Sequence, residues 1–283
     1  MVLGASGQLG HALVKRLGGR LSPGLAPSRR ELDLVDTDAV AAFLERWAPD
    51  AIVNAAGFTD VVLAESPPVR ETVFRLNRDL PATLARTCHR LGMRLLHVST
   101  DFVFDGERGT PYRESDSPRP MQVYGLSKLA GENEVLSRDP GALVVRTSTL
   151  FGPAPRPRPN FVDAVLARAR SLAVIDVVEP PVSSPTYAPD LAEALLGLLE
   201  GEVSGLLHVT NSGQCTRFEL ATAVVEAAGL AHRVRVVPRT TVADAIRRPA
   251  YSVLDTSRYA SVAGAPLRSW REALAAHLEA RDS

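Results

Sequence analysis

Tyr124 and Lys128 are the two residues of this chain whose types and spacing best suit proton transfer. They lie four positions apart in the segment Tyr-Gly-Leu-Ser-Lys, so on a helix they would share one face. Of the 32 lysines and arginines, only Lys15 and Lys128 are lysine, which indicates that position 128 needs a compact charge rather than the planar fork of arginine. A nearby ammonium favours the ionised form of a phenol. The pair therefore predicts a proton-exchanging tyrosine, although an exposed helix pair without function has the same spacing.

A glycine-rich turn begins directly after the first three residues. Gly4, Gly7 and Gly10 precede an apolar-periodic helix that runs to Leu17. Between a strand and a helix, such a turn lets the backbone approach a pyrophosphate, which the free N–H groups of the helix then bind. The Gly-x-x-Gly-x-x-Gly spacing differs from the simplest dinucleotide fingerprint and is weak evidence alone. Together with the downstream Tyr-x-x-x-Lys, it resembles the extended branch of the short-chain dehydrogenase/reductase superfamily.

Composition and charge argue against several other classes of protein. The formal net charge is zero, with 45% apolar and 23% charged residues, so no basic field favours nucleic acid or an anionic membrane. No apolar run reaches the length of a membrane span, and no signal peptide is recognisable. Cys88 and Cys215 fit neither a metal spacing nor a disulfide framework. We expect a cytoplasmic protein with two inert thiols and no nucleic-acid or membrane partner.

After a short segment that ends near Leu25, strand-like apolar runs alternate with helical segments in the first half of the chain. The expected order is helix 37–47, strand 51–56, helix 68–91, strand 95–99, helix 123–137 and strand 142–146. Nearly continuous apolar strands that alternate with helices are typical of a parallel sheet covered on both faces. The sequence therefore predicts an α/β fold with a Rossmann-type, doubly wound parallel sheet, and a cofactor at the carboxyl ends of its strands.

The second half of the chain alternates less regularly. The expected elements are helices 160–173, 187–200, 218–228 and 267–280 and a strand at 206–210. We expect residues 1–150 to form an NAD(P)-binding domain to which the segment 185–210 returns. Residues 151–184 and 211–283 would form a smaller, discontinuous substrate-binding lobe.

The residues after the strand at 95–99 narrow the resemblance. Ser99-Thr100-Asp101-Phe-Val-Phe-Asp105-Gly106 resembles the dTDP-4-dehydrorhamnose reductase family. Further matching segments are 53–56, 59, 64–65, 123–125, 128–132, 247–249 and 252–255. The resemblance spans nearly the whole chain. It implies hydride transfer from NADPH or NADH to the 4-keto carbon of a dTDP-linked 6-deoxyhexulose.

The chemistry of ketone reduction suggests a role for each of four residues. Hydride arriving at carbon leaves charge on oxygen, which needs a proton from a positioned acid. Tyr124 would be that acid, with Lys128 lowering its pKa and contacting the nicotinamide ribose. Thr100 would hydrogen-bond the same oxygen or tune Tyr124, unless it is only a strand-end hydroxyl. Asp101 would hold a sugar hydroxyl, with a helix cap or turn residue as the alternative. The expected substrate-binding set is Thr100, Asp101, Thr149 and Asn160.

The residues that select the cofactor come after Leu25. Ser28 and Arg29 precede the first carboxylate, Glu31, and an arginine suits the 2′-phosphate of NADPH. We therefore favour NADPH, with NADH possible, although a solvated surface turn explains the arginines equally well. The complete expected cofactor set is Gly4, Ser6, Gly7, Gln8, Leu9, Gly10, Ser28, Arg29, Asp33, Leu34, Ala55, Ala56, Gly57, Tyr124 and Lys128.

Several positions depart from the family pattern. Thr149 and Arg217 stand where the family has tryptophan, and Val62 stands in place of an aspartate. Loss of aromatic surface predicts a wider, more polar sugar pocket. Phe102 replaces the glutamate that related dehydratases use. Ala12 replaces the glutamate of a magnesium-bridged dimer, so we expect no metal site.

Two other functions share this scaffold. One is an epimerase or reductase of the extended branch that acts on another nucleotide sugar. The other is a non-catalytic regulatory subunit, against which the set of Thr100, Tyr124 and Lys128 argues. A homodimer is possible.

Overall fold

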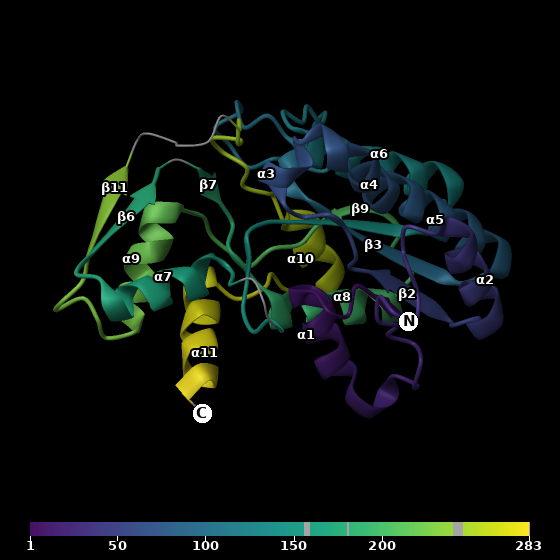
Figure 1. The fold of residues 1–283 in the computed structure, drawn as a ribbon, viewed down its shortest axis with the longest axis horizontal. Coiled ribbons are helices and arrows are strands. Elements are labelled where there is room, and N and C mark those ends of the chain that lie inside the picture. The colour runs from purple at the N-terminus through teal and green to yellow at the C-terminus, as the bar shows by residue number, and fades with distance from the viewer. Residues whose placement is uncertain (156–158, 180, 240–245, 283) are drawn as a thin grey trace.

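The computed structural model describes residues 1–155, 159–179, 181–239 and 246–282 of the chain. Its centre is a five-stranded sheet in the order β1-β2-β3-β4-β9, and all neighbouring strands are parallel (Figure 1). The strands are β1 Val2–Leu3, β2 Ala51–Asn54, β3 Arg94–Thr100, β4 Leu143–Thr147 and β9 Gly205–His208. The predicted α/β fold with a parallel, Rossmann-type sheet is confirmed.

Helices cover both faces of this sheet because successive strand residues point to opposite sides. Leu3, Ile52, Leu95 and Val144 pack beneath the helices of one face, and their neighbours Val2, Val53, Leu96 and Val145 pack beneath those of the other. The first face carries α2 Thr37–Trp47, α5 Leu80–Leu91 and α6 Val123–Arg138, and the second carries α1 Gln8–Leu17 and α8 Ala188–Glu200. Each fully buried aliphatic side chain contributes roughly 1.5–3 kcal/mol to this packing.

The helical segment expected at 68–91 contains a π-helical turn. In chain order it comprises η2 Pro67–Val69, α4 Arg70–Phe74, the π-helical η3 Arg75–Asp79 and α5. It follows the short helix α3 Val61–Ala64. The wider turn at η3 buries the side chain of Asn77, which is fully inaccessible. Such π-bulges occur frequently at functional sites, and the sequence pattern did not predict this one.

The segment that ends near Leu25 forms no regular strand in the described structure. The carbonyl oxygen of Leu25 accepts a hydrogen bond of 2.7 Å from the N–H of Val2 at the edge of β1. The short 3-10 helix η1 Gly18–Arg20 and a series of turns occupy this part of the chain.

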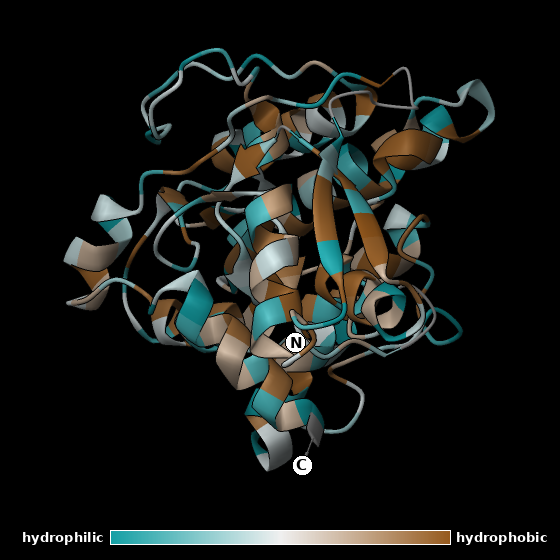
Figure 2. Cartoon of the chain, turned by 90° about the vertical axis from the view of Figure 1, so that its left-hand side faces the viewer, coloured by the Kyte–Doolittle hydropathy of each residue, from teal (hydrophilic) through white to brown (hydrophobic). Residues whose placement is uncertain are grey.

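A second layer of structure packs around its own hydrophobic core at the left of Figure 1. Its elements are α7 Phe161–Ser171, β6 Val174–Val178, α9 Arg217–Ala227, β11 Arg235–Arg239 and α11 Trp270–Asp282. Strands β6 and β11 pair in parallel. Figure 2 views the molecule from this end and shows hydrophobic and hydrophilic residues interspersed along the helices. The predicted lobe boundaries stay a prediction.

Short elements connect the two layers. Strand β5 Leu150–Phe151 pairs with β8 Thr186–Tyr187, and β7 Val182–Ser183 pairs with β10 Cys215–Thr216. The remaining elements are η4 Asp101–Val103 and α10 Ser257–Ala263. Within the described ranges, no helix has both the length and the apolar character that spanning a membrane requires.

Candidate active site

Helix α6 positions Tyr124 and Lys128 on one face, as their spacing predicts. The N–H of Val123 at the start of this helix donates a 2.7 Å hydrogen bond to the Glu65 carboxylate, which is favourable at the positive end of a helix dipole. Tyr124 lies in the first turn, and its ring meets that of Phe102 edge-on at 5.8 Å. Glu65 therefore fixes the end of the helix from which Tyr124 projects.

The ammonium of Lys128 is held inside the protein. Its side chain is 5% exposed, and Nζ lies 2.6 Å from the carbonyl oxygen of Val98 and 3.4 Å from Nε2 of His97. Burial lowers the pKa of Lys128 to about 8, while the negative charge of Glu132 raises it. Burial also lowers the pKa of His97, as does the Lys128 charge. At neutral pH the site therefore holds one ammonium beside a neutral imidazole.

Burial dominates the titration of Tyr124. It raises the pKa of the phenol to about 12, the contact with the Thr100 hydroxyl lowers it, and the Asp101 charge raises it further. Lys128 is not among the groups that shift this pKa, so the expected lowering of the Tyr124 pKa by Lys128 is not seen. In this structure Tyr124 is a protonated acid at every physiological pH.

Thr100 and Asp101 come together at the carboxyl end of β3. Thr100 Oγ1 accepts from the N–H of Phe102 and donates to Asp101 Oδ1 at 3.1 Å. Asp101 is 3% exposed, and its Oδ2 accepts from Ser148 at 2.8 Å and from Ser252 at 2.5 Å. Protein hydroxyls therefore bond both carboxylate oxygens of Asp101, and its contact with a sugar hydroxyl stays a prediction.

Asn77 and Ser127 join the site without having been predicted. Asn77 Oδ1 accepts from the N–H of Phe58 at 2.8 Å, and Nδ2 donates to the Phe58 carbonyl and to Ser127 Oγ at 2.9 Å. A Cβ on Gly57 would lie 2.9 Å from this Oδ1, so glycine is needed there. Asn77 thus fixes the loop after β2 to helix α6. An asparagine, a poor helix former, inside a helical run was the available signal.

The glycine-rich turn has the shape of an anion cradle. Gly4 has a φ of +82°, and a Cβ on Gly10 would lie 2.1 Å from the Gly4 carbonyl oxygen, so both positions require glycine. Gly7, the N-cap of α1, provides no side-chain cap, and in this described segment the first turn carries no acidic residue. Its N–H groups suit a pyrophosphate. Ser6 and Gly7 are exposed at this turn.

Two other residues of the turn serve the fold through their side chains. Leu9 is 5% exposed and packs in the core under α8. The amide of Gln8 donates a 2.9 Å hydrogen bond to the carbonyl oxygen of Gly152. Either residue would therefore meet a cofactor only through its backbone.

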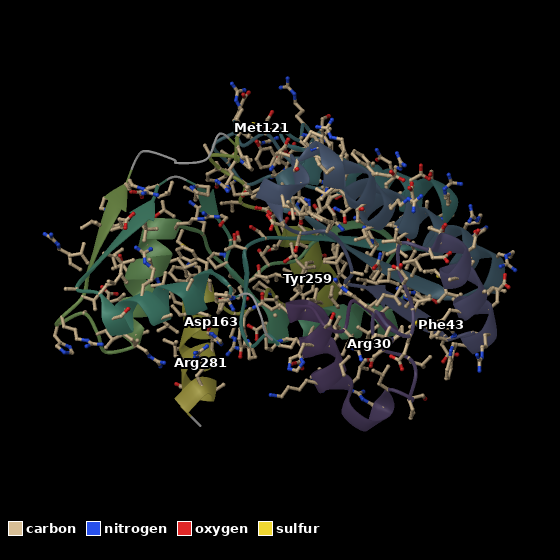
Figure 3. The ribbon with its side chains drawn as sticks, in the orientation of Figure 1. Arg30, Phe43, Met121, Asp163, Tyr259 and Arg281 are labelled. Atoms are coloured by element: carbon tan, nitrogen blue, oxygen red, sulfur yellow. The ribbon has the colours of Figure 1, made fainter. Side chains whose placement is uncertain are left out.

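The proposed adenosine side of the site lies on the surface. Ser28 N–H donates to Glu31 Oε2 at 2.8 Å, and Arg29, Arg30 and Glu31 are all exposed. Arg30 is labelled near α1 in Figure 3. Glu31 thus brings a carboxylate to the turn that was expected to receive a 2′-phosphate.

The other expected cofactor residues lie in a turn before α2 and in the loop after β2. Asp33 caps the turn at Val35 through a 3.0 Å hydrogen bond, and Leu34 packs against the core. Ala56 donates its N–H to Asn54 Oδ1, and Ala55 lies beside it at the end of β2.

The two remaining substrate candidates hold protein structure. Asn160 caps α7 through the N–H of Asp163 and donates to the carbonyl oxygen of Gly152 at 2.9 Å. Asp163 also pairs with Arg281 of α11, beside it in Figure 3. Thr149 has a φ of +39°, and its Oγ1 lies 2.8 Å from Ser183 Oγ. Their contacts with a sugar stay a prediction.

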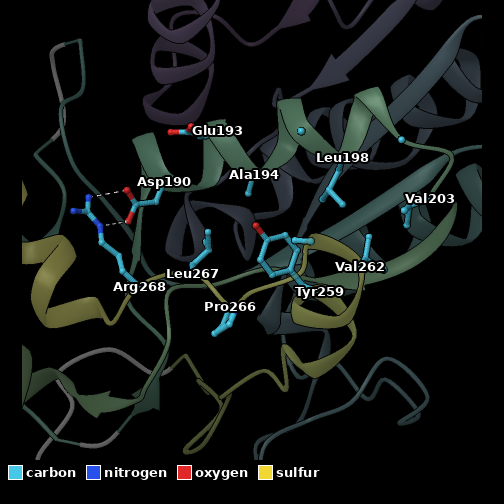
Figure 4. Close-up of a pocket in the computed structure, with 13 residues that line it drawn as sticks. Asp190, Glu193, Ala194, Leu198, Val203, Tyr259, Val262, Pro266, Leu267 and Arg268 are labelled. Carbon is cyan, nitrogen blue, oxygen red and sulfur yellow. Dashed lines mark hydrogen bonds and ion pairs between the residues drawn. The ribbon is translucent and has the colours of Figure 1, made fainter.

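A separate hollow of about 530 Å³ lies between α8 and α10 (Figure 4). It contains none of the predicted site residues. The side chains that line it include Asp190, Glu193, Leu198, Tyr259, Val262 and Arg268. Among the described residues, no group of histidine, cysteine or acidic side chains is arranged to hold a metal. Burial raises the thiol pKa of Cys88 and Cys215 to about 12, so both are protonated thiols.

The parallel sheet, the glycine cradle and the Tyr124–Lys128 pair together define an extended short-chain dehydrogenase/reductase. Within that class, the chain belongs to the family described as "RmlD substrate binding domain", whose model matches residues 1–282. The resemblance drawn from the sequence motifs is therefore confirmed.

Named relatives share most of their length with this chain. A dTDP-4-dehydrorhamnose reductase of Mycobacterium tuberculosis H37Rv is 39% identical over 99% of this chain and 92% of its own. A dTDP-4-keto-6-deoxy-D-glucose reductase of Streptomyces niveus is 35% identical over 97% and 94%.

Solved structures of similar fold are also dTDP-4-dehydrorhamnose reductases. A dTDP-4-dehydrorhamnose reductase from Clostridium acetobutylicum has a TM-score of 0.92 and 30% identity, covering 100% of this chain and 99% of its own. The Bacillus anthracis enzyme in complex with NADP has a TM-score of 0.90 and 30% identity, over 98% and 97%.

Proposed function

We propose that this protein is an NADPH-dependent reductase of a dTDP-linked 4-keto-6-deoxysugar. The observation that carries the proposal is the meeting of Thr100, Tyr124 and buried Lys128 at the carboxyl end of the sheet, beside the loop after β2. The names of the relatives, and the NADP complex of one of them, support it.

The residues of the glycine-rich turn fit NADPH. A Cβ at Gly4 would clash with the backbone of Ala55 and Ala56, and one at Gly10 with that of Gly4, so these glycines let the turn pack tightly before α1. The start of α1 would bind the pyrophosphate. Arg29 would face the 2′-phosphate, and Lys128 the nicotinamide ribose. Bound there, NADPH supplies a hydride to the carbonyl carbon.

The protein's own groups manage the proton. Tyr124 donates its proton to the oxygen that becomes negative on reduction, and its raised pKa keeps it protonated beforehand. The buried Lys128 ammonium would place a positive charge at this end of the sheet, where negative charge develops during reduction. Thr100 holds the phenol in place. In the reverse direction the Tyr124 phenolate would accept the proton of the alcohol.

The substrate is expected to differ from the rhamnose precursor. Thr149 and Arg217 would line a wider, more polar pocket than tryptophan gives. The guanidinium of Arg217 lies over the ring of Phe161, 5.7 Å from its centroid. A cytoplasmic location and a homodimer are further expectations, to be checked by fractionation and light scattering.

NADPH oxidation against a panel of dTDP- and UDP-linked keto sugars tests the proposal. We expect turnover of at least one dTDP-4-keto-6-deoxysugar and none with the Tyr124→Phe variant. Epimerisation without net NADPH oxidation would instead identify an epimerase. Tight NADPH binding without turnover of any keto sugar would identify a regulatory subunit.

A further inference from the structure

Asp101 lies at a junction of three chain segments directly behind Thr100. Its carboxylate accepts hydrogen bonds from the hydroxyl groups of Thr100 at 3.1 Å, of Ser148 after β4 at 2.8 Å and of Ser252 at 2.5 Å. Ser252 is 151 residues further along the chain and is 1% exposed. One buried carboxylate therefore connects the ends of two sheet strands to the C-terminal part of the chain.

The segment around Ser252 is held in place by backbone pairing. The N–H of Ser252 donates to the carbonyl of Val182 in β7, and the N–H of Val182 donates to that of Ala250, each at 2.9 Å. On its other side, Tyr112 N–H donates to the Val253 carbonyl at 2.8 Å. The position of Ser252 is thus coupled to β7 as well as to Asp101.

A second hydroxyl contact runs in parallel with the first. Ser148 Oγ lies 3.4 Å from Thr149 Oγ1, which lies 2.8 Å from Ser183 Oγ in β7. Ser183 directly follows Val182, the residue that pairs with Ser252. Both sets of hydrogen bonds, one through Ser252 and one through Ser148 and Thr149, therefore connect the turn at Thr100 to β7 and to the segment around Ser252.

The charge balance explains why three hydroxyls are needed. A buried carboxylate without a partner is costly, and charge-assisted hydrogen bonds offset that cost. Among the ion pairs of the described residues, no cation pairs with Asp101. The facing titratable group of α6 is the Tyr124 phenol, and the Lys128 ammonium of that helix points to Val98. Loss of any one hydroxyl therefore removes one of the hydrogen bonds that offset the burial of the carboxylate.

We propose that Asp101 is a positioning residue, which through Ser148 and Ser252 latches the C-terminal segment onto the Thr100 turn. The inference rests on the proposed reductase function. In the latched arrangement, Thr100 is held against Tyr124 while the segments at 182–183 and 252 are fixed beside the reacting end of the sheet. A sugar-binding role for Asp101 would leave the serines dispensable, which separates the two interpretations.

Ser252→Ala tests the latch, because it removes one hydroxyl from Asp101. We expect kcat for the keto sugar to fall about 10-fold or more, the size of one hydrogen bond to a charged group. The KM for NADPH should be unchanged. Asp101→Asn, which places an NH₂ among hydroxyl donors, should reduce kcat more than Ser252→Ala does. Ser252→Thr, which keeps the hydroxyl, should recover most of the activity.

Ser212→Ala is the matched control. Ser212 Oγ also bonds across the chain, to the carbonyl of Leu267 at 2.5 Å, but contacts none of the active-site residues. This variant should keep wild-type kcat. Hydrogen exchange should increase at 250–254 in Ser252→Ala and not in Ser212→Ala.

The outcomes separate the latch from the reductase function. An active wild type with an equally active Ser252→Ala would overturn the latch and leave the reductase intact. A KM increase for the sugar confined to Asp101→Asn would assign Asp101 to substrate binding instead. If the wild type reduces no keto sugar, the function fails, and unchanged exchange at 250–254 would then overturn the latch independently.

Discussion

The ammonium of Lys128 lies 2.6 Å from the carbonyl oxygen of Val98, two residues before Thr100 on β3. This contact joins the helix that carries the proton donor to the strand that carries its hydroxyl neighbour. The Lys128 side chain is 5% exposed, so the buried space around its ammonium suits one compact cation. The retention of lysine in an arginine-rich chain is explained by that space.

Lys128→Arg should reduce kcat/KM at least ~100-fold, because a planar guanidinium cannot take the place of the ammonium. Tyr124→Phe should abolish turnover. Steady-state kinetics measures both losses, and circular dichroism should show folded proteins. Lys15→Arg is the matched control: Lys15 is the other lysine, exposed on α1, and its replacement should change nothing. Wild-type activity in Lys128→Arg would remove the basis of the reductase proposal.

The activity should fall as the pH rises through the pKa of Lys128. Burial lowers that pKa to about 8, so above this pH the site loses the buried positive charge that would offset the negative charge developing during reduction. Tyr124, with a pKa of about 12, stays protonated throughout. A kcat/KM profile for reduction should therefore show one alkaline decline near pH 8. A flat profile up to the ordinary pKa of lysine, near ~10.4, would contradict this.

Two exposed residues should set the choice of cofactor in opposite directions. Arg29→Ala should weaken NADPH binding by roughly 1–3 kcal/mol and leave NADH unaffected. Glu31 has a lowered pKa because it accepts from the Ser28 N–H, so it is ionised at neutral pH and repels a phosphate. Glu31→Gln should therefore tighten NADPH binding. Calorimetry that finds NADH bound as tightly as NADPH by the wild type would rule out this assignment.

Sequence reasoning succeeded where the signal is local. The glycine-rich turn, the Tyr-x-x-x-Lys spacing and the strand–helix alternation each depend on residues within a few positions of one another. It carries no signal where a side chain's partner lies far along the chain: Asp101 bonds Ser252, and Gln8 and Asn160 both donate to Gly152. No periodicity encodes such pairs. Asn77 was missed although an asparagine inside a helical run is unusual, because no periodicity marks where a π-helical turn replaces an α-helical one.

Removing one partner of the buried ion pair beneath the site should strongly destabilise the protein. Arg146 and Glu132 are 2% and 1% exposed, and their side chains are joined at 2.6 Å. Glu132 also accepts from Ser99 at 2.5 Å. Arg146→Met would leave a buried carboxylate unpaired and should cost about 3–5 kcal/mol. Urea unfolding measures this. The double variant Glu132→Leu/Arg146→Met should recover most of the loss, and an equally unstable double variant would show that packing is responsible instead.

The sugar preference should depend on Thr149 and Arg217 rather than on Tyr124 and Lys128. Thr149 occupies a position with a φ of +39° and bonds Ser183, so it offers a small polar surface where the family has an aromatic one. We therefore expect dTDP-4-keto-L-rhamnose to be reduced poorly, or no better than a differently substituted dTDP-keto sugar. Competition assays that compare kcat/KM across the panel measure this preference.

Thr149→Trp should shift that preference toward the rhamnose precursor, since stacking on an aromatic ring is worth about 0.5–1.5 kcal/mol. That corresponds to roughly a 2- to 10-fold change in the ratio of the two kcat/KM values. Val62→Asp restores another residue of the family pattern, at an exposed position of helix α3. Because Val62 lies on a different element from Thr149, this variant serves as a comparison for Thr149→Trp. If the wild type already reduces the rhamnose precursor far faster than every other keto sugar, the substitutions at 149 and 217 are neutral, and the pocket needs no aromatic wall to select rhamnose.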